Sequence, residues 1–260
     1  MYWYDGRAVD SEFIEIAVNA PEFSYGASVF TTMRIYEKNL DHPLTYWSAH
    51  CDRLKQTLTA FHWQQPNWNH LKQGALYLAK HFPVLRLTVF PQGTELITGR
   101  NLPPDLQQRQ IKGITAWVAR EDIYRRELTA HKTGNYLGAY LARSRALSLN
   151  VKEAILIDSA GNWLETSTGN LWGYKNGCWY TPCLEMGILP GIARSHLLKS
   201  LQDRKLPIKE NIWTLDFVDS LEGLFYSNCV VGIIPIVKVI NFDRSSNEPK
   251  EYNASIQIAL

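Results

Sequence analysis

The sequence of 260 residues lacks several features that mark whole classes of proteins. No uninterrupted apolar run approaches the roughly 18 residues that a membrane-spanning helix needs. No long block of like charges occurs, and the 27 lysines and arginines nearly balance the 25 aspartates and glutamates. This balance argues against a nucleic-acid partner and against a basic membrane-binding surface. The expected partner is therefore a small molecule.

Cysteine is scarce as well, because the sequence has four residues of this type and no CxxC pair. Cys178 and Cys183 have no histidine or cysteine partners at the spacing of a zinc site, so buried thiols and no metal are predicted. The N-terminal stretch MYWYDGRAVD lacks a charged region followed by an apolar one, which argues against a secretion signal. These absences are typical of a cytoplasmic protein.

Apolar residues make up 45% of the chain, which is enough for one large core or two smaller ones. Helical spacing predicts helices over residues 45–61 and 67–81, a third helix after Lys132, and a fourth after Pro190-Gly191. The apolar face of the third helix would consist of Leu137, Tyr140, Leu141, Ser144 and Leu147.

Strands are predicted where residues alternate or are rich in β-branched and aromatic types. The segment 91–110 is polar and contains proline, so it is expected to be a loop. A charged connection over 120–129 predicts a boundary near residue 120, between a smaller N-terminal α/β domain (1–119) and a larger β-rich domain (120–260). The predicted strands are EFIEIAV (12–18), SVFTTMRIY (28–36), VLRLTVF (84–90), GITAWVARED (113–122) and EAILID (153–158), with a hairpin at Asn176-Gly177.

Four motifs contain residues that suit a chemical role. Each motif alone has an ordinary explanation, such as a surface lysine, a carboxylate at the end of a strand or the start of a helix. They are HCDRL with Arg53, HKTGNY with Lys132, LETSTGNLW with Glu165, and TPCLEMGILPGIAR, in which a helix begins after Gly191. In this order they resemble the class IV aminotransferases, the fold-type IV enzymes of pyridoxal 5′-phosphate, over the chain from SYGASVFTTMR to SNCVVGIIPI.

The resemblance implies an α/β fold of two domains with a barrel-like C-terminal sheet, a homodimer and a small amino substrate. It assigns Lys132 to the Schiff base with the cofactor and to proton transfer at the substrate Cα. A carboxylate must face the protonated pyridine nitrogen, and Glu165 matches that position. The other matches are Arg53 and the backbone of Gly191 and Ile192 for the phosphate, Tyr136 for the ring hydroxyl, and Asn228 and Cys229 as further phosphate contacts.

Other polar residues near these motifs receive no catalytic role. His50 lies one helical turn before Arg53, and a structural histidine is the simpler interpretation. Arg34, Arg100 and Arg125 are candidates for a substrate carboxylate, and a single sequence does not rank them.

Two reactions fit this set of residues. The stretch FTTMR, Phe30 to Arg34, resembles the aminodeoxychorismate lyases, which eliminate pyruvate to give 4-aminobenzoate in folate biosynthesis, and it places Thr31 and Thr32 among the catalytic residues. The KTGNY pattern and the divergent FPQGTELITGR segment leave a transaminase of branched-chain or D-amino acids as the alternative. A non-catalytic relative is a third hypothesis, against which the retained Schiff-base lysine argues. The lyase is the favoured prediction.

Overall fold

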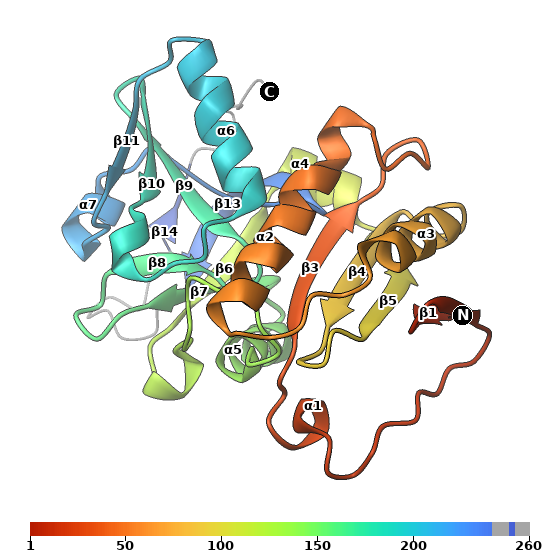
Figure 1. The fold of residues 1–260 in the computed structure, drawn as a ribbon. Helices are drawn as coiled ribbons and strands as arrows, with labels where there is room; N and C mark the ends of the chain where they lie inside the picture. Colours follow the sequence, from red (N-terminus) through yellow and green to blue (C-terminus); the bar gives the residue numbers. More distant parts are fainter. Residues whose placement is uncertain (241–249, 253–260) are drawn as a thin grey trace. The chain divides into compact units, whose positions relative to one another are not determined.

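The computed structural model describes residues 1–240 and 250–252, and its contacts divide the chain into two compact units (Figure 1). Unit 1 comprises Met1–Pro103 and His131–Asn135, and unit 2 comprises Pro104–Ala130 and the chain from Tyr136 on. These units differ from a single boundary at residue 120. Strand β6 (Ile114–Ala119) belongs to unit 2 because it is hydrogen bonded to two strands of that unit.

Unit 1 is built on an antiparallel sheet of five strands in the order β2-β1-β5-β4-β3. The strands are β1 (Tyr2–Tyr4), β2 (Arg7–Val9), β3 (Val29–Arg34), β4 (Val84–Val89) and β5 (Glu95–Arg100). Helices α2 (Trp47–Ala60) and α3 (Trp68–Ala79) pack their leucines on one face, which we call the inner face of the sheet. The short elements α1 (Pro21–Ser24) and η1 (Pro43–Thr45) complete the unit.

Strands β3 and β4 and helices α2 and α3 confirm the predictions for these segments. The predicted strand over 12–18 is wrong: the segment forms no strand, and Phe13 and Val18 are more than four-fifths exposed. Alternation predicts a strand only where one face is buried, and here neither is. The true N-terminal strands β1 and β2 meet at Asp5-Gly6, whose positive φ angles form a tight hairpin turn.

The loop predicted over 91–110 is wrong as well, because it contains β5 and helix α4 (Leu106–Lys112). A turn at Gly93, which has a φ of 84°, brings β5 back along β4 with all six residues of β5 in register. Proline residues precede the helix instead of interrupting it, and the helix begins after Asp105. Proline content alone therefore misassigned two regular elements.

Unit 2 contains a nine-stranded sheet in the order β11-β10-β9-β12-β13-β6-β7-β8, with β14 added beside β13. Because β8 also pairs with β9, the strands β9, β12, β13, β6, β7 and β8 form a closed ring, as the resemblance predicts. The new strands are β7 (Glu153–Ile157), β8 (Trp163–Thr166), β9 (Asn170–Lys175), β10 (Cys178–Pro182), β11 (Ile208–Asn211), β12 (Gly223–Asn228), β13 (Gly232–Ile240) and β14 (Lys250–Glu251).

Helices pack against this sheet at several places. Helix α5 (Leu137–Ser148) covers β6 and β7, and α6 (Ile192–Asp203) packs on β11 and β12. The shorter elements are η2 (Asp122–Tyr124), η3 (Leu184–Met186) and α7 (Leu215–Asp219). Among the described residues, no helix has both the length and the apolar character to cross a membrane.

The predictions for unit 2 locate the elements well. Strand β7 is buried throughout, β9 and β10 meet in a hairpin at Asn176-Gly177, and α6 begins after Gly191. Helix α5 is confirmed, but its predicted apolar face is wrong. Leu137, Tyr140 and Leu147 are exposed, whereas the buried residues are Ala139, Ala142 and Ala146. Small side chains allow this helix to lie close to the sheet.

Candidate active site

Lys132 lies in a short segment of unit 1 that extends the sheet beside β3. The Phe30 N–H donates to the Lys132 carbonyl at 2.8 Å, and the Gly134 N–H donates to the Ser28 carbonyl at 2.7 Å. A side chain at Gly134 would overlap the carbonyl oxygen of Gly26, so only glycine allows this close approach. The glycine of the HKTGNY motif therefore fixes the backbone that carries Lys132.

The Lys132 ammonium lies 4.8 Å from the centre of the Phe30 ring. Phe30 points to the outer face of the sheet, away from α2 and α3, because its neighbours in the strand, Val29 and Thr31, alternate with it. His131 holds the segment from the other side through Thr57, at 3.2 Å between Nδ1 and Oγ1. The lysine is thus placed on a sheet surface that the unit 1 core does not occupy.

The outer face of strands β3, β4 and β5 is cationic. Arg34, Arg86 and Arg100 all project to it, and the Arg86 guanidinium lies 3.6 Å from the centre of the Phe30 ring. Thr32 pairs across the strands with Arg86 and shares this face with Phe30. The other positions of the face are Val84, Thr88, Leu96 and Thr98, so these three strands contribute no carboxylate to it.

Arg53 and Thr31 meet on the inner side of β3. One guanidinium nitrogen of Arg53 donates to the Thr31 hydroxyl oxygen, which also contacts His50 Nδ1. Arginine has no acceptor, so the Thr31 proton is the one available to His50. Thr31 and His50 are completely buried, so both support Arg53 from within the unit 1 core.

Glu165, the carboxylate among the predicted site residues, is a buried residue of β8 in unit 2. One of its oxygens pairs with the Arg126 guanidinium, and the other accepts a hydrogen bond from the Leu189 N–H at 3.2 Å. Arg126 is only 4% exposed and also lies 4.4 Å from the centre of the Tyr136 ring. Two predicted cofactor residues, Glu165 and Tyr136, therefore both contact Arg126, a residue that no sequence motif indicated.

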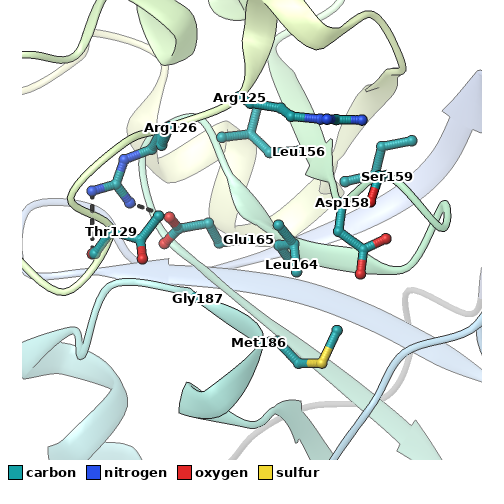
Figure 2. A pocket seen from close by; sticks show the side chains of 11 residues that line it. Arg125, Arg126, Thr129, Leu156, Asp158, Ser159, Leu164, Glu165, Met186 and Gly187 are labelled. Atoms are coloured by element: carbon teal, nitrogen blue, oxygen red, sulfur yellow. Dashed lines mark hydrogen bonds and ion pairs between the residues drawn. The ribbon is translucent and has the colours of Figure 1, made fainter.

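A pocket of about 250 Å³ opens beside this ion pair within unit 2. Figure 2 shows the Arg126 guanidinium directed at the Glu165 carboxylate, with a second contact to Thr129. Arg126 and Glu165 belong to segments far apart in sequence, and no sequence motif connects them. The rest of the lining is formed by Arg125, Leu156, Ile157, Asp158, Ser159, Leu164, Met186 and Gly187.

Gly191 and Ile192 lie at the start of α6. Gly191 occupies the N-cap position, and no side chain among the described residues caps the first turn. The backbone N–H groups of such a turn suit an anion. Asn170 of β9 lies against Gly191, because a Cβ at Gly191 would overlap its Oδ1 atom.

Asn228 and Cys229 follow β12 at the turn to β13. The side-chain oxygen Oδ1 of Asn228 accepts from the N–H groups of Val230 and Val231 at 2.9 and 3.0 Å, and its side-chain amide nitrogen donates to the Thr168 carbonyl at 3.2 Å. The side-chain oxygen of Asn228 is therefore bound within the turn, and its amide nitrogen joins the turn to the loop between β8 and β9. The Cys229 thiol is half-buried beside it.

A second buried carboxylate, Glu153 of β7, supports the loop between β8 and β9. It accepts hydrogen bonds from the hydroxyls of Ser167 and Thr168 and from the Ala154 N–H. Burial raises the pKa of Glu153 above its usual value, and these hydrogen bonds only partly oppose that effect. In the sequence, Glu153 is recognisable only as part of a buried strand.

Known proteins resemble the chain over most of its length. A sequence profile of the family described as amino-transferase class IV matches residues 28–239. The aminodeoxychorismate lyase of Vibrio harveyi is 21% identical over 252 residues, which cover 91% of this chain and 90% of the relative. The branched-chain-amino-acid aminotransferase of Salmonella typhimurium is 23% identical over 261 residues, which cover 91% and 84%. Relatives with two different activities thus match about equally well.

A solved structure shows the same fold. The branched-chain amino acid aminotransferase of Escherichia coli superimposes with a TM-score of 0.77 at 23% identity, covering 92% of this chain and 86% of the other. At this identity the likeness concerns the fold, and the activity has to be argued from the site.

Proposed function

The chain belongs to the class IV aminotransferase family, whose members are enzymes dependent on pyridoxal 5′-phosphate, and we propose that it is an aminodeoxychorismate lyase. The observation that carries the proposal is the outer face of the unit 1 sheet, where Thr32 and three arginines share a surface with Phe30 and the Lys132 ammonium.

The donor set of the described residues fits the cofactor. A phosphate binds to cations and N–H donors, and each unit contains a donor of this kind: Arg53 in unit 1 and the first turn of α6 in unit 2. A pyridinium nitrogen requires a buried carboxylate, and Glu165 is one. When bound, the cofactor stabilises the negative charge that develops at the substrate Cα. We assign the covalent attachment of the cofactor to Lys132.

Lys132 would also move the proton at the substrate Cα, since its amine is released when the substrate amine binds. The two threonines receive different roles. Thr31 is fully buried with its hydroxyl on Arg53 and His50, so we assign it to the positioning of Arg53. Thr32 lies on the outer face and is the hydroxyl suited to proton transfer to the leaving group.

The arginines of the outer face suit the charge of the substrate. 4-Amino-4-deoxychorismate carries two carboxylates, and arginine binds carboxylates through paired N–H donors. Arg34, Arg86 and Arg100 supply enough cations for both groups, and the three strands add no competing carboxylate. Arg125 belongs to the pocket of unit 2 and is already paired with Asp122. We therefore prefer the arginines of unit 1 for the substrate.

Transamination is the second candidate. Tyr136 follows Lys132 in the pattern KTGNY, and the tyrosine is held in place by Arg126. This pattern resembles the aminotransferases, and the relative from Salmonella typhimurium covers as much of the chain as the lyase relative does. Under both hypotheses we propose a homodimer in the cytoplasm. The molar mass from light scattering of the protein as it elutes from a size-exclusion column tests the dimer.

A single-turnover experiment separates the candidates. Protein loaded with cofactor is mixed with an equal amount of 4-amino-4-deoxychorismate, and separately with leucine, glutamate and D-alanine. A lyase forms equal amounts of 4-aminobenzoate and pyruvate and recovers its visible absorbance. A transaminase forms a keto acid and loses that absorbance with one of the amino acids. Bound cofactor without either product would identify a non-catalytic relative.

The role of Thr32 has its own control. Thr32→Val removes the hydroxyl on the outer face and is expected to slow pyruvate release in the lyase reaction. Thr98→Val changes a threonine on the same face, two strands away, and should leave the rate unchanged. Equal rates for wild type and Thr32→Val would contradict the role of this hydroxyl.

A further inference from the structure

Leu189, two residues before Gly191, is held at both of its backbone polar atoms by side chains. Its N–H donates to Glu165 at 3.2 Å, and its carbonyl accepts from the Asn170 amide at 2.9 Å, both in buried surroundings. Glu165 and Asn170 are directly paired residues of β8 and β9, so their side chains leave the sheet on the same face. Together they bind the N–H and the carbonyl of Leu189, the two groups that a neighbouring strand would otherwise bind.

Asn170 also restricts the backbone after Leu189. The Gly191 backbone lies directly against the Asn170 side chain, with no room for a Cβ at this position. Pro190 connects the two contacts, and its ring fixes φ. Asn170 therefore contacts both the first and the last of the three residues that lead into α6, Leu189 to Gly191.

The support of Asn170 is rigid. The loop before it is fastened by Glu153, which accepts hydrogen bonds from the hydroxyls of Ser167 and Thr168. Gly169 packs so closely on β12 that a Cβ would overlap a backbone oxygen there. Asn170 itself is only 3% exposed. A side chain held in this way transmits the position of the sheet to the start of α6.

We propose that Asn170 is a positioning residue for cofactor binding: it holds Leu189 and Gly191 so that the first turn of α6 presents its N–H groups to the cofactor phosphate. The inference rests on the proposed function, in which Gly191 and Ile192 are the phosphate contacts. Asn170 acts through the backbone and does not itself need to touch the cofactor. Its loss should therefore weaken the binding of the phosphate more than the binding of the ring.

The test compares pyridoxine 5′-phosphate with pyridoxine as ligands of the cofactor-free full-length protein, because neither forms a bond to Lys132. Asn170→Ala removes the donor to the buried Leu189 carbonyl, and we expect the preference for the phosphorylated ligand to fall about tenfold. The matched control is Thr181→Val, which removes a buried hydrogen bond of 2.8 Å to the carbonyl of Leu171. It should lower stability and leave the preference unchanged.

The outcomes separate this inference from the proposed function. An unchanged preference in Asn170→Ala, with stability lowered as in Thr181→Val, overturns the inference and makes Asn170 a structural residue only. Wild-type protein that binds neither ligand, or binds both equally, contradicts the proposed function instead. If Asn170→Ala does not fold, Asn170→Ser is the second variant, because its hydroxyl is too short to reach the carbonyl. A normal preference in that variant overturns the inference as well.

Discussion

Unit 1 and unit 2 hold their predicted site residues by different kinds of contact. In unit 1 the side chains of the predicted site residues contact other side chains. Arg53 and His50 share the hydroxyl oxygen of Thr31, and the Lys132 ammonium lies against the ring of Phe30. Each of these groups has its own rotamers, so a substitution changes contacts between side chains and leaves the backbone in place.

In unit 2 the contacts run largely from side chains to the backbone. Glu165 and Asn170 both bind Leu189, and Asn228 binds the turn that follows it. A side chain that holds a backbone segment affects every group on that segment. We therefore expect substitutions in unit 1 to act locally and substitutions in unit 2 to affect several functions at once.

Lys132→Ala is expected to have the largest effect on activity and almost none on stability. The lysine is the assigned attachment and proton-transfer group, and its side chain lies outside the unit 1 core. Turnover and the visible absorbance of the bound cofactor should both be lost, while the thermal midpoint of the apoprotein stays unchanged. Lys80→Ala, an exposed lysine of the same unit, is the control. Retained turnover in Lys132→Ala would remove the central assignment.

Glu165→Gln should affect activity and stability together, as expected for unit 2. The amide cannot balance a pyridinium charge, so turnover should fall by orders of magnitude with the cofactor still bound. Replacing the carboxylate also leaves the buried Arg126 without this counter-ion, which costs about 3 kcal/mol of the free energy of unfolding. Urea denaturation of the apoprotein and single-turnover rates measure the two effects.

The double variant with Arg126→Gln sharpens this result. If the two groups are coupled, the stability loss of the double variant is smaller than the sum of the single losses, because no buried charge remains. Additive losses would show that the pair contributes no coupling. A loss of turnover without any loss of stability in Glu165→Gln would break the distinction between the units.

Arg53→Ala should weaken cofactor binding by about 1.5–3 kcal/mol, the range of a hydrogen bond to a charged group. Thr31→Val removes the hydroxyl that positions Arg53 and should weaken binding by about 1 kcal/mol. The control is Thr45→Val, another buried threonine of unit 1, whose hydroxyl donates to the Asn39 carbonyl. Cofactor titration of the apoproteins measures all three. Equal affinity in Thr31→Val and wild type would remove its positioning role.

The sequence predicted helices and buried strands where one residue pattern decided the structure. The periodic leucines of α2 and α3 and the apolar run of β7 are local signals, and all three elements are confirmed. Pairing was harder to predict. Strand β5 contains a glycine and polar residues, and it exists because β4 lies alongside it. The face of α5 was misassigned because its alanines carry a weaker hydrophobic signal than its exposed leucines.

The site residues divide in the same way. Lys132, Glu165 and Arg53 are recognisable because each belongs to a motif with fixed neighbours in sequence. Arg126 and Asn170 are not, since their roles arise from contacts with residues 39 and 19 positions away. No local pattern reports such contacts. The assigned roles of all these residues stay predictions until the variants are measured.

Glu153→Gln is expected to give the smallest effect, visible only as a change with pH. Burial raises the pKa of Glu153 in the folded protein. The contribution of Glu153 to the free energy of unfolding is therefore complete below its unfolded pKa and is lost as the pH rises through its folded pKa. Relative to wild type, the variant should therefore gain stability from acidic to neutral pH. Asp105→Asn should show the opposite trend, because hydrogen bonding to Arg109 lowers the pKa of Asp105. Urea denaturation at a series of pH values measures both, and parallel curves for Glu153→Gln and wild type would contradict the raised pKa.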